Sequence, residues 1–202
     1  MIPRGHSEVG VASRTLPGQR ECGDMAVTVS TSDQSTIGVV DGLGHGSQAA
    51  LAARVAVETL EKHNGETLPE LLRRCHDALR STRGAAITVA SLSSKDETVT
   101  WLGVGNIGGR LVRCRPESKA HETIMSAAGL AGHALPSLHP VTLPVQRGDL
   151  LVIATDGVRD GFAESLYPYG SAQDIADRIL AEYHDERDDA LVFVARYLGG
   201  SR

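Results

Sequence analysis

The order in which strand-like and helix-like patterns follow one another constrains the fold of this chain most. Short apolar runs typical of strands come first, at Glu8–Ser13, Met25–Thr31 and Thr36–Asp41. Two helical patterns, several strand-like runs, one more helix and a last strand then follow. Because two helices stand together between groups of strands, the order does not match repeated βαβ units. It favours antiparallel sheets with helices packed outside them, an α+β layered sandwich.

Capping residues mark three predicted helices. Apolar residues of the first helix include Leu51, Val55 and Leu60, and Asn64-Gly65 favours its end. The other two helices open with capping boxes, in which a Thr or Ser stands three residues before an acidic residue. The predicted starts are near Ser47, at Thr67-Leu68-Pro69-Glu70 and at Ser171-Ala172-Gln173-Asp174.

The second half of the chain carries most of the remaining strand patterns. One of them, Leu150–Ala154, is continuously apolar, which is typical of a strand buried on both faces. The other predicted strands are Ala86–Leu92, Thr98–Val104, Gly109–Cys114, Val141–Val145 and Ala190–Ala195.

Composition narrows the classes of function. The length of 202 residues suits one domain, and we expect residues 1–202 to form it. Aromatic residues make up only 3% and the net charge is -5, which disfavours both base stacking and binding to a phosphate backbone. No apolar run approaches the length that spans a membrane. We therefore expect a cytoplasmic protein, monomeric, that binds neither nucleic acid nor membrane.

Two apolar runs end in the same dipeptide. Ile37–Val40 leads into Asp41-Gly42, and Leu150–Thr155 leads into Asp156-Gly157. An aspartate at the end of a buried strand is held rigidly, and the glycine after it lets the backbone turn and bring a carbonyl oxygen toward a cation. Such oxygen ligands suit Mg²⁺ or Mn²⁺. The alternative is that Asp-Gly is a simple turn, a common use of this dipeptide.

Two further acidic groups precede strands. Asp24 stands before the Met25–Thr31 run, and Asp188-Asp189 stands before the last strand. Adjacent carboxylates next to a buried strand are costly to keep ionised unless a cation meets them. A solvated acidic turn at positions 184–189 remains the alternative.

Taken together and in this order, the four acidic segments resemble the metal-dependent protein phosphatase (PPM, or phosphatase 2C-like) superfamily, and among its branches the short bacterial SpoIIE-like type. The likeness covers Cys22 to Tyr197 and includes Arg83-Gly84-Ala85 and Val104-Gly105-Asn106. It implies a four-layer α-β-β-α sandwich of two antiparallel sheets flanked by helices. It also implies a protein serine/threonine phosphatase that uses two Mn²⁺ or Mg²⁺ ions to activate a water.

The resemblance also implies roles for single residues. Asp41 would bridge the two ions, the carbonyl of Gly42 would bind one of them, and Asp156 and Asp188 would complete one ion's shell. Asp24 would serve the other ion, directly or through water. Asp41 and Asp156 are thus the expected catalytic centre.

Three residues are expected to have accessory roles. Asp160 falls where some family members hold a further metal weakly. Asp189 would orient a ligand or close the turn, since alternate residues of a strand point to opposite faces and only one of the pair should reach the metals. His45 would protonate the leaving group, or would be an exposed loop histidine.

The sequence departs from the eukaryotic members at two places. They carry a histidine directly after Asp-Gly, where this chain has Leu43, and an N-terminal phosphate-binding arginine, for which this chain offers Arg4 in a stretch without a clear pattern.

The resemblance suggests phosphorylated STAS-domain proteins of a stressosome-like complex as partners. A non-catalytic PPM-fold binding module, or pseudophosphatase, is the alternative function. An aspartyl-phosphate enzyme is disfavoured because Asp41-Gly42-Leu43 lacks the second carboxylate of an Asp-x-Asp pair, and a nucleotide-binding loop because no Gly-Lys-Ser/Thr follows.

Overall fold

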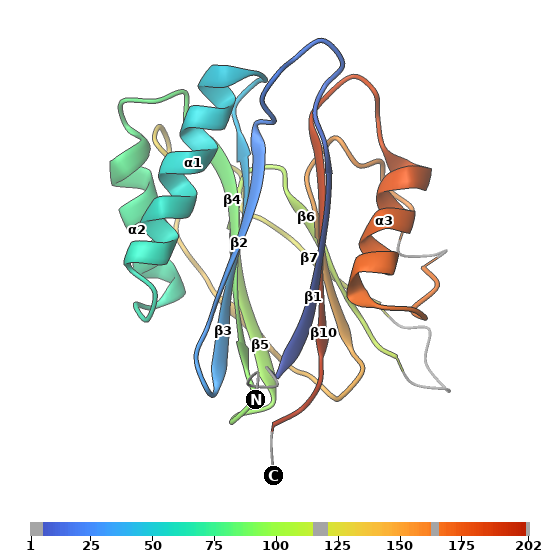
Figure 1. Cartoon of the computed structure of the whole chain (residues 1–202). Helices are drawn as coiled ribbons and strands as arrows, with labels where there is room; N and C mark the ends of the chain where they lie inside the picture. The colour runs from blue at the N-terminus through green and yellow to red at the C-terminus, as the bar shows by residue number, and fades with distance from the viewer. Residues whose placement is uncertain (1–5, 115–120, 163–165, 201–202) are drawn as a thin grey trace.

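The computed structural model describes residues 6–114, 121–162 and 166–200. Within these ranges the chain forms two five-stranded sheets packed face to face, with α1 and α2 on one outer side and α3 on the other (Figure 1). The predicted four-layer α-β-β-α sandwich is confirmed. Arg4 lies outside the described residues.

Every strand pairing in the two sheets is antiparallel. One sheet has the order β1-β10-β9-β6-β7, and the other has the order β2-β3-β4-β5-β8. The first sheet consists of β1 (Ser7–Arg14), β10 (Ala190–Tyr197), β9 (Leu150–Ala154), β6 (Gly108–Val112) and β7 (His121–Ile124). The second consists of β2 (Asp24–Ser30), β3 (Gln34–Gly42), β4 (Ala85–Ser93), β5 (Thr98–Val104) and β8 (Val141–Pro144).

The central strands are buried on both faces, as the continuous apolar run at Leu150–Ala154 predicted. In β9, Leu151 and Ile153 point into the core between the sheets, whereas Leu150 and Val152 pack in the core that α3 covers. A strand in this position needs apolar residues at every position, because a helical layer covers the face turned away from the partner sheet.

Helices α1 (Ser47–Lys62) and α2 (Leu68–Leu79) cover the second sheet, and α3 (Ala172–Tyr183) covers the first. Both predicted capping boxes form: the Thr67 N–H donates to Glu70 at 3.0 Å, and the Ser171 N–H donates to Asp174 at 2.8 Å. No helix in the described ranges is long and apolar enough to cross a membrane.

Three details differ from the sequence-based expectations. Strand β7 was not predicted, and β6 spans Gly108–Val112 rather than Gly109–Cys114. In α1 the residue Leu51 is 43% exposed. The buried face of α1 is built from alanines and one leucine, which let this helix lie close to the sheet: Ala49, Ala50, Ala52, Ala53, Ala56 and Leu60.

Candidate metal centre

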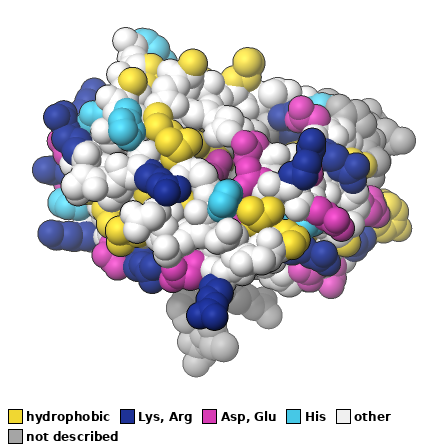
Figure 2. All heavy atoms as spheres, turned by 90° about the horizontal axis from the view of Figure 1, so that it is seen from above, with side chains coloured by type: hydrophobic (Ala, Val, Ile, Leu, Met, Phe, Trp, Pro, Cys, Tyr) yellow, Lys and Arg dark blue, Asp and Glu magenta, His cyan; other side chains and the backbone are white. Residues whose placement is uncertain are grey.

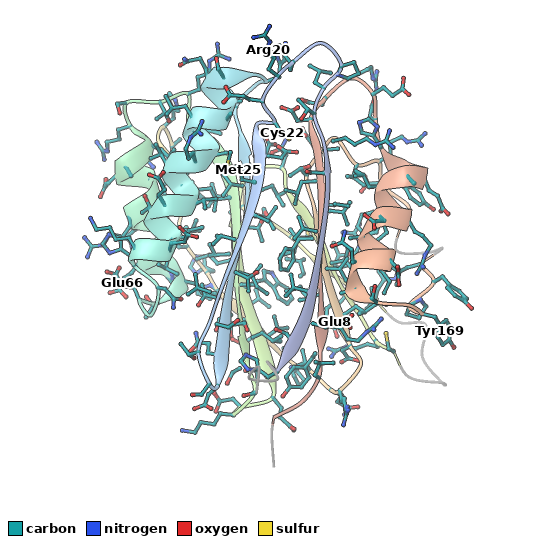
Figure 3. All side chains as sticks on the ribbon, in the orientation of Figure 1. Glu8, Arg20, Cys22, Met25, Glu66 and Tyr169 are labelled. Atoms are coloured by element: carbon teal, nitrogen blue, oxygen red, sulfur yellow. The ribbon has the colours of Figure 1, made fainter. Side chains whose placement is uncertain are left out.

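Four predicted ligand carboxylates come together at one end of the sandwich. Asp24 is the first residue of β2 and pairs directly with Asp41, near the end of β3. Asp156 follows β9 and Asp188 precedes β10, so the other sheet supplies the second pair. Figure 2 looks onto this end and shows acidic side chains gathered near its centre. In Figure 3, Cys22 marks the same end, near the top of the space between the sheets.

Asp24 is held by a hydrogen bond from the opposite sheet. Its side chain is buried, with the residue only 5% exposed, and it accepts a hydrogen bond from the Thr155 hydroxyl at 2.7 Å. The same hydroxyl accepts from the Leu191 N–H at 2.8 Å, so Thr155 is itself fixed by β10. Thr155 therefore sets the position of Asp24, a role that the sequence reasoning did not assign to it.

Asp156 is oriented by Asn106. The Asn106 amide donates to an oxygen of Asp156 at 2.6 Å. Asn106 follows β5 just after Gly105, whose φ of +104° is a backbone conformation that glycine adopts without strain. The sequence reasoning noted Val104-Gly105-Asn106 only as part of the resemblance and missed this contact.

The adjacent residues Asp188 and Asp189 do different things. Both oxygens of Asp189 accept backbone hydrogen bonds at 2.7 Å, one from the Leu16 N–H and one from the Gly23 N–H. Asp189 is 2% exposed, and its carboxylate is used in holding the chain together just ahead of Asp24. Asp188 is half-buried, and its carboxylate accepts a hydrogen bond from the Asp189 N–H at 2.8 Å but from no other residue in the described part of the chain.

The glycines after Asp41 and Asp156 are required by close packing. A Cβ on Gly42 would lie 2.1 Å from the carbonyl oxygen of Ala49 in α1, and one on Gly157 would lie 1.9 Å from that of Asp189. Without a side chain on Gly42, α1 packs closely against the end of β3, and without one on Gly157 the residue before β10 packs closely against the turn after β9. We expected these glycines to serve a sharp turn; their packing role is an additional reason for them.

The group of carboxylates is short of positive charge. Burial raises the pKa of Asp41 to about 8, and repulsion from Asp24 adds to the shift. Burial also raises the pKa of Asp24 to about 7, against the lowering effect of the Thr155 hydrogen bond. Within the described ranges, no Lys, Arg or His forms an ion pair with Asp24, Asp41, Asp156 or Asp188.

These residues fit a bound divalent cation. Hard carboxylate oxygens are the ligands that Mg²⁺ and Mn²⁺ prefer, and a cation would offset the burial and the repulsion that raise the pKa values of Asp24 and Asp41. Among the residues that the structure describes, no three His, Cys, Asp or Glu side chains are already drawn into a preformed metal cluster. The fit to a divalent cation therefore rests on the chemistry of the carboxylate ligands and on the lack of a paired positive charge.

The remaining two predicted site residues lie at the rim. His45 is exposed in the loop between β3 and α1, with no hydrogen bond to its side chain from any described residue. Asp160 is in the loop after Asp156, its side chain is 99% exposed, and it lies 3.8 Å from the Arg110 guanidinium. A further metal at Asp160 would have to sit beside that positive charge.

The comparisons with known proteins agree with this architecture. The profile of the family described as stage II sporulation protein E (SpoIIE) matches residues 31–198. The chain belongs to the SpoIIE family. It is 23% identical over 190 residues to the phosphoserine phosphatase RsbX of Bacillus subtilis (strain 168), covering 94% of each protein.

Solved structures share this fold. A chain described under "The bacterial stressosome: a modular system that has been adapted to control secondary messenger signaling" superimposes with a TM-score of 0.86 at 29% identity, over 94% of this chain and 99% of that one. RsbX in complex with magnesium gives a TM-score of 0.84 at 21% identity, over 95% of each chain. The predicted resemblance to SpoIIE-like phosphatases is confirmed.

Proposed function

We propose that this SpoIIE-family chain is a Mn²⁺- or Mg²⁺-dependent phosphatase that hydrolyses phosphoserine or phosphothreonine on a partner protein. One observation carries the proposal. Four carboxylates, two from each sheet, converge without a positive partner in the described ranges, in a chain similar along 94% of its length to the phosphoserine phosphatase RsbX.

Five residues would hold the metal ions. Asp41 would bridge two ions; the Gly42 carbonyl, Asp24, Asp156 and Asp188 would complete their shells. Two such ions supply an activated water near neutral pH and neutralise charge on the phosphoryl oxygens. The chain's own residues prepare the site: Thr155 fixes Asp24, and Asn106 fixes Asp156.

The shape of this end supports a protein substrate. Asp156 and the loop residues Leu43 and His45 are exposed, so a phosphoryl group on the surface of another protein can reach the carboxylates. Leu43 is 50% exposed beside Asp41 and gives that partner an apolar contact.

Phosphorylated STAS-domain proteins of a stressosome-like complex are the partners that we propose. Support comes from the similarity to RsbX and to the solved chain described with the bacterial stressosome. The monomeric state and the cytoplasmic location stay predictions.

A non-catalytic binding module is the second candidate function. Proteins of that kind commonly lose ligands, whereas all the expected aspartates are present here and lie at one end of the sandwich.

The deciding experiment measures phosphate release from a phosphoserine protein with EDTA, and again after Mn²⁺ or Mg²⁺ is added back. We expect release only with metal, and loss of release in Asp156→Asn. Asp33→Asn is the matched control, because Asp33 lies in the exposed β2–β3 turn at the opposite end of β3. Normal Mn²⁺ binding without any turnover would favour the binding module.

A further inference from the structure

A pocket of about 240 Å³ opens beside Asp156, along the ends of β6 and β9. It adjoins the carboxylate group, and two arginines and two aspartates contribute to its wall. In Figure 2 basic side chains lie beside the acidic group at this end of the molecule. Its polar and aromatic lining comes from Asn106, Arg110, Asp156, Arg159, Asp160 and Phe162.

Arg110 is held in place without a strong anionic partner. Its side chain is 16% exposed, its guanidinium lies over the Phe162 ring at 5.8 Å, and one Nη donates to the Gly109 carbonyl at 2.9 Å. The Nε is buried and has no hydrogen-bond partner in the part of the chain that the structure describes. A buried donor left without an acceptor is destabilising, so the hydrogen bonding of this guanidinium is incomplete within the described residues.

The one acidic side chain within ion-pair distance of Arg110 in the described ranges is easily displaced. Asp160 lies 3.8 Å from the guanidinium, and its side chain is 99% exposed. An ion pair this exposed contributes little to stability, because water solvates the carboxylate well. A substrate carboxylate that enters the pocket can therefore replace Asp160.

Arg159 places a second positive charge at the rim. Its guanidinium donates to the carbonyl oxygens of Glu182 at 2.8 Å and Tyr183 at 3.4 Å, at the C-terminal end of α3. Neither partner is a carboxylate, so its charge is not neutralised by these contacts. The two arginines offset the field of the neighbouring aspartates for an acidic ligand.

Asp156 lines one part of the pocket, and Arg110 lines another part, further back along β9. Arg110 pairs with Val152 in β9, four residues before Asp156, and β9 itself ends at Ala154. An extended peptide rises about 3.3 Å per residue, so the pocket suits a side chain a few residues away from the phosphorylated one.

We propose that this pocket is an anion subsite of the enzyme: Arg110, with Arg159 at the rim, binds an acidic side chain of the substrate protein a few residues from its phosphoserine or phosphothreonine. The subsite rests on the proposed phosphatase function and adds a substrate preference to it.

The test uses two phosphoserine peptides that differ only in carrying Glu or Gln at the flanking positions. We expect the wild type to show a KM about tenfold lower for the Glu peptides, the ratio that about 1.4 kcal/mol produces. Arg110→Met, which keeps an apolar stem against Phe162, should remove that preference, so that its KM values for the Glu and Gln peptides become equal. Asp160→Asn should lower KM for the Glu peptides further, since it removes the competing carboxylate.

Arg73→Gln on the exposed face of α2 is the matched control and should keep the preference. Thermal unfolding of each variant checks that the fold is retained, and Arg110→Lys serves as the second variant if Arg110→Met unfolds. Equal KM values for the two peptides in the wild type would overturn the subsite. The subsite would also be overturned if Arg110→Met lowered kcat/KM for the Gln peptides and for aryl phosphates as much as for the Glu peptides.

Failure of the proposed function would look different. If the wild type hydrolysed neither peptide with Mn²⁺, the proposed phosphatase function would be wrong. Binding of fluorescently labelled Glu and Gln peptides, measured by anisotropy, would still test the preference for Glu directly. Preferential binding there would support the subsite, and equal binding would overturn it.

Discussion

Replacing Asp41 by Asn should make the metal-free protein more stable while removing its response to metal. Asp41 is half-buried near the end of β3 beside Asp24, and its pKa is raised from 3.8 to about 8. At pH 7 the unfolded chain has this carboxyl ionised, whereas the fold keeps it largely protonated. Asparagine has nearly the same shape and carries no charge at any pH, so the variant avoids this mismatch.

The size of the effect follows from the pKa shift. Each unit corresponds to about 1.4 kcal/mol, so about three units between the ordinary value and pH 7 correspond to about 4 kcal/mol. Because Asp24 takes part in the same repulsion, we expect Asp41→Asn alone to recover about half, about 2 kcal/mol. For a chain of this length that raises Tm by about 4–8 °C.

Thermal unfolding in EDTA, and again with Mn²⁺, measures both parts of the prediction. Wild type should gain about 3 kcal/mol at a metal concentration 100 times Kd, and Asp41→Asn should gain far less, so the order of stabilities inverts. Asp33→Asn should behave as wild type in both conditions. An Asp41→Asn protein that is less stable than wild type in EDTA would refute the electrostatic reasoning, and an undiminished Mn²⁺ shift would refute the role of Asp41 as a ligand.

Three further outcomes can be measured. Without metal, the free energy of unfolding should fall as pH rises from about 4 to about 8, because folded Asp24 and Asp41 still hold protons that the unfolded chain has released. Urea titrations in EDTA test this, and the free energy of unfolding should be lower at pH 8 than at pH 5. Asp188→Ala should abolish turnover and weaken Mn²⁺ binding in calorimetry, with little change in Tm. Asp189→Ala should keep measurable turnover but lower Tm, since two backbone N–H groups lose their acceptor. The reverse result would mean that the two aspartates exchange roles. A folded phosphoprotein should be hydrolysed with a much higher kcat/KM than p-nitrophenyl phosphate, and equal values for both would contradict recognition through protein surface contacts.

Local chemistry predicted a large part of this fold. The capping boxes at Thr67 and Ser171 form as their sequences indicate, and the continuous run Leu150–Ala154 is a strand buried on both faces. These features depend on neighbouring residues alone, so the sequence contains them directly. The acidic segments at the strand ends likewise indicated where the carboxylates gather.

Features set by distant contacts could not be predicted in the same way. Strand β7, His121–Ile124, has one buried apolar residue, Ile124, and forms because it pairs with β6. The hydrogen bond from Thr155 to Asp24 joins residues 131 positions apart, and that from Asn106 to Asp156 joins residues 50 apart. No local pattern encodes either contact, although the residues on both sides were noted.

The same distant contacts explain why the carboxylates sit between the sheets rather than on one of them. Asp24 and Asp41 come from the β2–β3 pair, and Asp156 and Asp188 flank β9 and β10 in the other sheet. Asp189 links the start of β10 to the Gly23 N–H just before β2, so the two sheets are clamped next to the site by hydrogen bonds that require no metal. Asp24 and Asp41 are thereby held away from water and beside other carboxylates, and burial first, then repulsion, raises their pKa values. A cation bound between the sheets would favour the ionised carboxylates, so we expect metal binding to release their protons and to stabilise the fold.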